Sequence, residues 1–350
     1  MTNDKGILIR NIYYMLSYAF TELKNNNYEN VKNESFEQIM NLFAEILWRG
    51  VSAQLKQGLF REYVNQTESL PTLRGRIEIN GTIRNVIRQR RELVCEYDTL
   101  SENNLLNRIL KSTMTLLIHD KDVDSKRKKQ LRNILPFFDN ASEINLSEVR
   151  WNNIQYQRNN MSYRMMLTIC RFIHECTIMT TETGDIRMST FTETHMNRLF
   201  ELFVLKYYKH HHPSLRANAD TIKWDIDCED SIGIEQLPSM QSDITLHYKE
   251  QTLIIDTKYY GKMMQSQYNK HTIHSANLYQ IFTYVKNLDK EKTGNVTGML
   301  LYAKTNDNTV PHLDTTIGGN RIIVDTIDLN QEFNGICNQL NSIPKHIEDA

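Results

Sequence analysis

The chain lacks any long apolar run. No stretch of its 350 residues approaches the ~20 consecutive apolar residues that a helix needs to cross a bilayer. The amino terminus, Met1–Lys5, also lacks the apolar segment of a secretory signal. We therefore expect a cytoplasmic protein, neither secreted nor embedded in a membrane.

Cysteine is scarce and shows no paired spacing. The odd number of five cysteines and the absence of a Cys-x-x-Cys pair argue against a disulfide framework and against a structural zinc site. The five are Cys95, Cys170, Cys176, Cys228 and Cys337.

Two more absences limit the possible functions. Neither G-x-x-x-x-G-K-[ST] nor G-x-G-x-x-G occurs, so we do not expect the chain itself to be an NTPase. Charge of one sign is not in excess either, because the formal net charge is only -1. Contact with DNA would therefore depend on local basic patches.

The length and the composition predict two globular domains. A chain of 350 residues is long for one core, and its 40% hydrophobic and 24% charged residues are typical of a globular protein. Asparagine and glutamine become abundant near residues 149–160, so we expect domains at 1–155 and 156–350. In the first domain, the pattern favours helices at 9–23, 35–55, 104–118 and from an N-cap at Ser125, and strands at 60–64, 76–79 and 93–97.

Six arginines lie within eighteen residues of the first half. Guanidinium groups bind phosphates and acidic protein surfaces, so this cluster is a candidate contact with DNA or with a partner protein. Arginines that are merely exposed on a strand and a helix are the alternative. The cluster consists of Arg74, Arg76, Arg84, Arg88, Arg90 and Arg91.

A β-hairpin is predicted near residue 250. Its strands are the segments 243–248 and 253–258, which flank a polar turn. Side chains alternate along a strand, so Asp256 and Lys258 point to the same side. If the turn is Lys249-Glu250, Asp243 lies directly across from Asp256, with Cβ atoms about 5 Å apart.

Two carboxylates at that distance repel each other unless a cation lies between them. Mg²⁺ suits a site with few carboxylates and several waters, and Mn²⁺ is a second candidate. A lysine at position 258 can contact a water molecule or a phosphate oxygen, which completes the groups needed to hydrolyse a phosphodiester. The alternative is an exposed hairpin with an ordinary cross-strand Asp/Lys pair.

The element order of the second half is that of the restriction-endonuclease-like core. In that α/β fold, a mixed sheet flanked by helices (an α-β-α arrangement) carries the metal ligands on its central hairpin. The expected helices are 161–176, 195–208 and 275–288, and the expected strands are 222–226, 242–248, 252–259 and 299–303.

The segment 237–260 resembles the PD-(D/E)xK nuclease signature, with Asp243 and Asp256-x-Lys258 at the matching positions. Ser242 departs from it, because proline usually precedes the first aspartate. The expected mechanism is metal-assisted hydrolysis, in which both aspartates and the Thr257 carbonyl hold Mg²⁺. Lys258 positions the attacking water and stabilises negative charge, and its role as a base stays open.

Further segments in both halves are similar to the McrC family. They are 10–19, 75–78, 107–113, 255–260 and 277–280. McrC is the nuclease subunit of the McrBC modification-dependent restriction system. The resemblance implies a partner, McrB, an AAA+ GTPase ring that binds GTP and recognises DNA with modified cytosine. It also implies that the first domain docks on this ring and stimulates GTP hydrolysis, while the second domain cuts double-stranded DNA and leaves a 5′-phosphate.

Three other residues are candidates for the same site. Gln280 and Tyr284 share one helix face and resemble the Gln-x-x-x-Tyr element of RecB-like nucleases, with a polar face and a packed tyrosine as the alternative. Glu201 is a candidate third carboxylate, with an ordinary solvated glutamate as the alternative. The segment 210–212 contains three histidines, which we interpret as a loop before Pro213 and not as a metal cluster.

A few neighbours of the site have open roles. His271 and His274 lie in an expected loop that could face DNA, and Tyr259 and Tyr260 follow Lys258, where core packing is favoured over stacking on substrate. Taken together, the sequence predicts the Mg²⁺-dependent nuclease subunit of a GTP-dependent restriction endonuclease. An autonomous DNA repair nuclease and a chiefly non-catalytic activator of a partner NTPase are the alternatives.

Overall fold

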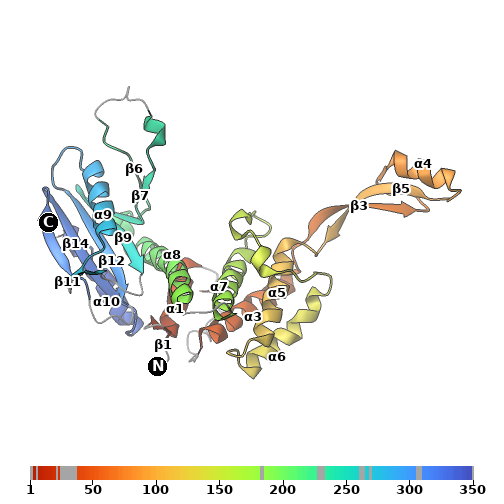
Figure 1. Cartoon of the computed structure of the whole chain (residues 1–350), viewed down its shortest axis with the longest axis horizontal. Coiled ribbons are helices and arrows are strands. Elements are labelled where there is room, and N and C mark those ends of the chain that lie inside the picture. The colour runs from red at the N-terminus through yellow and green to blue at the C-terminus, as the bar shows by residue number, and fades with distance from the viewer. Residues whose placement is uncertain are drawn as a thin grey trace. The chain divides into compact units, whose positions relative to one another are not determined.

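A computed structural model describes residues 3–4, 7–20, 23, 38–181, 185–226, 233–259, 265–267, 270–304 and 310–348 (Figure 1). The chain forms two compact units. Residues 43–174 make one unit, and residues 1–42 together with 175–350 make the other. Within the described residues, no helix combines the length and the apolar character required to cross a membrane.

This division differs from the expected boundary at residue 155. The first helix, α1 (Ile9–Ala19), packs against α8 (Asp185–His211) of the second half. Nδ2 of the buried Asn11 donates to the carbonyls of Leu329 at 2.9 Å and Gln331 at 2.8 Å. These contacts place the first helix with the second half of the chain.

The polar segment 149–160 is not a linker. The ring of Trp151 stacks on that of His174 with centroids 6.1 Å apart, and Asn152 Oδ1 accepts a hydrogen bond of 3.1 Å from Arg171. Trp151 and Asn152 of this segment are therefore held against His174 and Arg171 within the smaller unit. Instead, the division falls within two continuous helices, α3 (Ile39–Gln57) and α7 (Tyr163–Thr181).

The larger unit is built on a mixed five-stranded sheet with the strand order β13-β14-β12-β9-β8. β9 pairs antiparallel with β8 and parallel with β12, and β14 pairs parallel with β12 and antiparallel with β13. All but the last residue of the central β12 are buried, as expected for a strand covered on both faces. The strands are β8 (Ile244–Tyr248), β9 (Gln251–Tyr259), β12 (Val296–Lys304), β13 (Leu313–Ile317) and β14 (Asn320–Asp328).

Helix α9 (Ser275–Leu288) covers one face of this sheet (Figure 1). Its Ile281 and Val285 belong to one buried cluster with strand residues such as Ile254 and Leu300. Gly298 of β12 allows this close approach, because an added Cβ would lie 2.7 Å from Val285 and 2.9 Å from Ile281. Helices α8, α10 (Phe333–Ser342) and α11 (Lys345–Glu348) also pack against the sheet.

Among its described residues, the larger unit also contains three two-stranded antiparallel pairs. They are β1 (Asn3–Asp4) with β2 (Ile7–Leu8), β6 (Thr221–Ile222) with β7 (Met240–Gln241), and β10 (Gln265–Gln267) with β11 (Lys270–Thr272). The strand expected at 222–226 is therefore shorter than its sequence pattern indicates.

The smaller unit combines a helical body with an arm. The arm, residues 62–101, consists of a three-stranded antiparallel sheet and one helix, and it projects from the body (Figure 1). The strands are β3 (Glu62–Leu70), β4 (Arg76–Ile77) and β5 (Leu93–Ser101), and the helix is α4 (Ile79–Ile87). The body contains α3, α5 (Leu105–His119), α6 (Ser125–Ile134) and α7.

Side-chain caps determine where several of these helices begin. Asn104 caps α5, and its Oδ1 accepts from the backbone N–H of Asn107 at 3.1 Å. For α6 the expected cap, Ser125, is wrong by one residue. Asp124 is the N-cap, because its Oδ1 accepts from the Arg127 backbone N–H at 2.9 Å. Since Asp and Ser are both good caps, the sequence alone could not separate them.

Candidate functional site

The hairpin of β8 and β9 has the predicted register. Ile244 pairs with Ile255 and Tyr248 pairs with Gln251, so a two-residue turn joins the strands. Lys249 in this turn has a φ of 51°, in the left-handed region that such tight hairpins require. One step beyond Ile244 the same register sets residue 243 opposite residue 256.

Asp243, Asp256 and Lys258 lie together at this end of the hairpin. Asp256 is buried, with 1% of its surface exposed, and Nζ of Lys258 lies 2.6 Å from its Oδ2. Oδ2 of Asp243 accepts two hydrogen bonds from Thr257, one from the backbone N–H at 2.7 Å and one from the hydroxyl at 2.8 Å. The Asp243 carboxylate is therefore held against Thr257 of β9, the residue that separates Asp256 and Lys258 in the sequence.

Burial and like charge act on the carboxylates of this cluster. Burial, and next the charge of Asp243, raise the pKa of Asp256 to about 6, while Lys258 opposes the shift. Burial is also the main cause that raises the pKa of Glu201 to about 7, and the charges of Asp243 and Asp256 add to it. Glu201 of α8 thus shares the electrostatic environment of the two aspartates.

The oxygen donors of the cluster fit a hard divalent cation. Oδ2 of Asp256 makes the ion pair with Lys258 but accepts no hydrogen bond among the described residues. Among all residues that the structure describes, no group of three or more His, Cys, Asp and Glu side chains is arranged to hold a metal ion. Asp243 and Asp256 are a small set of carboxylate oxygens, and Mg²⁺ is the ion that keeps several of its waters in such a site. The Thr257 carbonyl as a further ligand stays a prediction.

Helix α9 brings two of the other candidates to the cluster. Nζ of Lys258 donates to Oε1 of Gln280 at 3.2 Å, and Nε2 of Gln280 donates to the Tyr284 hydroxyl at 2.9 Å. The i, i+4 spacing places both side chains on the face of α9 that is turned to β9. Tyr284 is at the same time part of the buried core, so the packed tyrosine considered above also holds.

Comparison with known proteins places the chain in a family. The family described as "McrBC 5-methylcytosine restriction system component" matches residues 3–303. The chain belongs to this family. It is 30% identical over 345 residues to the type IV methyl-directed restriction enzyme EcoKMcrBC of Escherichia coli (strain K12), across 96% of the chain and 97% of that protein. The resemblance to McrC is thereby confirmed.

A solved structure shares the fold of this McrBC family member. It is the refined half-complex from the tetradecameric assembly of Thermococcus gammatolerans McrB AAA+ hexamers with bound McrC, and the TM-score is 0.52 at 15% identity. The match covers 96% of this chain and 79% of that chain. At this identity the likeness is one of fold.

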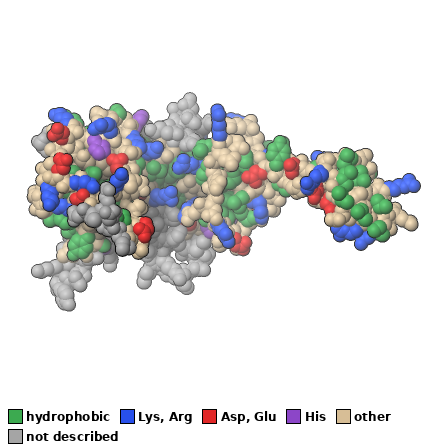
Figure 2. All heavy atoms as spheres, turned by 90° about the horizontal axis from the view of Figure 1, so that it is seen from above, with side chains coloured by type: hydrophobic (Ala, Val, Ile, Leu, Met, Phe, Trp, Pro, Cys, Tyr) green, Lys and Arg blue, Asp and Glu red, His purple; other side chains and the backbone are tan. Residues whose placement is uncertain are grey.

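The arm of the McrBC family member carries an exposed apolar stripe. Ile79, Ile83, Val86 and Ile87 follow the spacing of one face of α4, and they are 67%, 51%, 65% and 74% exposed. Figure 2 shows hydrophobic side chains gathered over the arm, with Lys and Arg side chains beside them. Such a stripe is typical of a surface that another protein covers.

The predicted arginine cluster lies on this arm. The Arg74 guanidinium stacks on the ring of Tyr97, 3.9 Å from its centroid, and Arg76 pairs with Glu96. The side chains of these two arginines therefore bind residues of the arm itself. Arg84 and Arg88 are exposed on α4 and at its C-cap, beside the apolar stripe.

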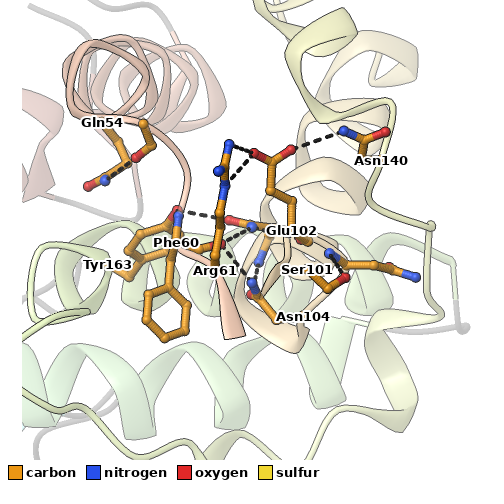
Figure 3. Close-up of polar contacts among 11 residues, drawn as sticks. Gln54, Phe60, Arg61, Ser101, Glu102, Asn104, Asn140 and Tyr163 are labelled. Atoms are coloured by element: carbon orange, nitrogen blue, oxygen red, sulfur yellow. Dashed lines mark hydrogen bonds and ion pairs between the residues drawn. The ribbon is translucent and has the colours of Figure 1, made fainter. Parts of the chain in front are cut away.

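A network of buried polar groups fixes the base of the arm (Figure 3). Nδ2 of Asn107, which is fully buried, donates to the carbonyls of Phe60 and Glu102, each at 2.8 Å. The Tyr163 hydroxyl donates to Oδ1 of Asn107 at 2.8 Å and accepts from the Phe60 N–H at 2.8 Å. Both strands that leave the body are thus tied to α5 and α7. Sequence reasoning missed this role, although Asn107 begins a segment that resembles the family.

The histidines at the end of α8 and after it make contacts away from Asp243 and Asp256. His211 ends α8, and its Nε2 lies 2.7 Å from the Tyr18 hydroxyl, while His212 lies 2.8 Å from Asn341 Oδ1. The expected loop before Pro213 is wrong for the first two histidines, because α8 continues through them. His274 is the N-cap residue of α9.

Of the two tyrosines after Lys258, the structure describes Tyr259 but not Tyr260. Tyr259 is buried with 4% of its surface exposed, and its backbone N–H donates to Asn197 of α8 at 3.0 Å. Core packing is therefore confirmed for Tyr259. Tyr260 and the side chain of His271 lie outside the described residues.

Proposed function

We propose that the chain is the nuclease subunit of a GTP-dependent, modified-cytosine-directed restriction endonuclease. In this proposal its mixed sheet is a restriction-endonuclease-like core, and its substrate is double-stranded DNA. Water attacks phosphorus, the bond from phosphorus to the 3′ oxygen breaks, and the products are a 5′-phosphate and a 3′-hydroxyl. The proton from the water passes to solvent, and the leaving oxygen takes up a proton.

The hairpin register is the observation that carries this proposal. It sets Asp243 opposite Asp256 and leaves Lys258 on the same strand, 2.6 Å from the Asp256 carboxylate. The buried carboxylate of Asp256, with Asp243 and Lys258 only partly exposed beside it, is costly in a purely structural role, because burial disfavours its charge. Membership of the McrBC family supports the same reading.

The roles of the residues follow from their positions. Asp243 and Asp256 would hold Mg²⁺, which when bound polarises the scissile phosphate and lowers the pKa of the attacking water. Lys258 places its ammonium where it can orient that water and stabilise negative charge on phosphorus. Gln280 accepts from Lys258 and donates to Tyr284, and this holds the lysine side chain in place.

The test is cleavage of methylated duplex DNA by the chain together with its partner GTPase, GTP and Mg²⁺. Asp243→Asn and Asp256→Asn should each lower the cleavage rate at least about 100-fold, because several kcal/mol of charge stabilisation are lost. Stimulation of GTP hydrolysis should persist. The matched control is Asp314→Asn, which changes a carboxylate of β13 that pairs with Arg321 at 2.7 Å. Retained cutting in Asp256→Asn would remove the assignment.

We also infer a second role, the stimulation of an McrB-like AAA+ GTPase ring that binds the GTP. The half-complex from Thermococcus gammatolerans contains McrC bound to McrB AAA+ hexamers. On this chain, the arm with its apolar stripe and exposed arginines favours such a docking role. The arm belongs to the smaller unit, so the proposal assigns docking to residues 43–174 and cleavage to the unit that contains the sheet.

A further inference from the structure

The backbone around Asp243 contains a β-bulge. Thr221 pairs with Gln241, and Ser242 N–H donates to the Asp220 carbonyl at 3.0 Å. Further along the pair, Asn218 and Thr245 exchange two backbone hydrogen bonds, of 3.0 and 2.6 Å. From the pair of Asp220 and Ser242 to the pair of Asn218 and Thr245, the first segment advances by two residues and the second by three. Asp243 and Ile244 together therefore oppose Ala219. An extra residue of this kind re-aims a side chain and is frequent beside active sites.

Two buried hydroxyls join the ends of this bulge. Ser242 and Thr245 are 2% and 1% exposed, and their hydroxyl oxygens lie 2.7 Å apart. Oγ of Ser242 also accepts from the backbone N–H of Asp220 at 3.0 Å. The hydroxyl pair therefore spans the two bulged residues and ties them to the neighbouring segment.

The opposite edge of the bulged strand faces β9. There the Asp243 carboxylate accepts from the N–H and the hydroxyl of Thr257. Asp243 is thus constrained from two sides, by the bulge at its backbone and by β9 at its carboxylate. Proline usually precedes this aspartate in the nuclease signature, and a serine here supplies the hydroxyl that a proline cannot.

We propose that Ser242 and Thr245 are positioning residues for the metal site. Their hydroxyl pair holds the bulge in the conformation that brings the Asp243 carboxylate to Thr257, the residue next to Asp256. This inference rests on the proposed function, because it assigns Asp243 and Asp256 to Mg²⁺. Groups that orient metal ligands without touching the metal typically change metal affinity by 10- to 100-fold when they are removed.

The experiment measures Mn²⁺ binding to the whole chain by calorimetry, together with the Mg²⁺ dependence of cleavage in the presence of the partner. Ser242→Ala and Thr245→Val each remove one hydroxyl and keep the shape. Both should weaken Mn²⁺ binding roughly 10-fold. Cleavage should return close to the wild-type rate at saturating Mg²⁺, since every charged group is intact. Thr245→Ser keeps the hydroxyl and should bind nearly as the wild type does.

The matched control is Thr326→Val, which removes a buried hydroxyl bonded to the Pro311 carbonyl in the same sheet. It should lower thermal stability without weakening Mn²⁺ binding. Because the two proposed hydroxyls bond to each other, the double variant Ser242→Ala/Thr245→Val should bind about as weakly as either single variant. Additive losses of Mn²⁺ affinity in the double variant would contradict a positioning role that the two hydroxyls share.

The outcomes separate this inference from the proposed function. Wild-type Mn²⁺ affinity in both Ser242→Ala and Thr245→Val overturns the positioning role, provided that Asp243→Asn and Asp256→Asn abolish binding. If the wild-type chain binds no Mn²⁺, or if the aspartate variants bind as the wild type does, the metal site itself is wrong. A loss in Thr326→Val equal to the loss in the hydroxyl variants would show a general effect of destabilisation.

Discussion

At the residue scale, Glu201 and Asp256 bring negative charge to one cluster from two elements, α8 and β9. Both have raised pKa values, Glu201 about 7 and Asp256 about 6, and burial is the first cause in each case. An acid whose pKa is raised on folding takes up a proton more readily in the folded state. Its ionised form therefore destabilises the fold, and a bound cation would offset this effect.

This environment predicts a pH dependence of stability. Without metal, the folded state binds more protons than the unfolded state between about pH 4.5 and 7, so stability should fall as the pH rises through this window. Mg²⁺ should raise the melting temperature more at pH 8 than at pH 5.5, because it binds the ionised carboxylates. Thermal melts in EDTA and in Mg²⁺ at the two pH values check this.

The matched variant for that measurement is Glu201→Gln, which keeps the shape and removes the titration. It should flatten the dependence on pH in EDTA above pH 6, where Glu201 contributes most. A melting temperature that rises with pH between 5.5 and 7 in the wild-type chain, and not in the variant, would have the wrong sign for a raised pKa.

At the scale of elements, the β8–β9 hairpin shows what a local pattern can predict. Its register follows from two apolar segments around a short polar turn, and a one-residue slip would turn Ile244 and Leu246 out of the core. The neighbours of the hairpin could not be predicted in this way. The bulge at Asp243 depends on Asn218 and Asp220. These residues precede β8 in the sequence and contact it only when the chain folds back on itself.

Helix α4 was missed for a different reason. Gly81 lowers helix propensity, and the apolar residues of this segment face outward and not into a core. Glu78 still starts the helix, because its side chain accepts from the backbone N–H groups of Asn80 and Gly81. An apolar helix face that packs on no core indicates a surface that binds another protein. The composition of the segment does not reveal that this face is exposed.

The exposed stripe of α4 predicts the site of partner docking. Ile83→Asp should raise the concentration needed to stimulate the partner's GTPase at least about tenfold, because a charge would replace an apolar contact. Stability should barely change, since this side chain is 51% exposed. Gln66→Asp, at an exposed position of β3, is the control with a similar change of charge. Equal effects of the two substitutions would mean that the charge, and not the stripe, is sensed.

The polar network at the base of the arm predicts a large effect of one asparagine. Asn107→Ala leaves the Glu102 carbonyl and the Tyr163 hydroxyl each without one partner, which should lower the free energy of unfolding by about 2–4 kcal/mol. Denaturant unfolding measures the loss. Asn103→Ala changes an exposed asparagine bonded to Ser142 and should cost much less. Similar losses would show that burial of the network is unimportant.

At the scale of the whole molecule, the sequence predicted the mixed α/β class, the hairpin and the family, and it misplaced the division of the chain. The grouping of Asp256 with Lys258 was predictable because these residues lie two apart on a single strand. The division was not, because it depends on contacts across more than 300 residues, such as those of Asn11 with Leu329 and Gln331. The strands β13 and β14 were also missed, although β14 pairs along β12 in the centre of the sheet.

The position of α1 predicts that its buried Asn11 stabilises the larger unit. Asn11 is 1% exposed and donates to two backbone carbonyls of the larger unit, so Asn11→Ala should destabilise that unit by about 1–3 kcal/mol. Hydrogen exchange resolved by peptide should show faster exchange in β8, which follows Asp243, and in β9, which carries Asp256, while residues 43–174 exchange as before. Arg10→Ala, at an exposed neighbour on the same helix, should change neither. Since docking is assigned to the smaller unit, stimulation of the GTPase should survive Asn11→Ala at temperatures where cleavage is already lost. Faster exchange confined to residues 43–174 would instead mean that the first helix stabilises the smaller unit, and the assignment of the two roles to the two units would have to change with it.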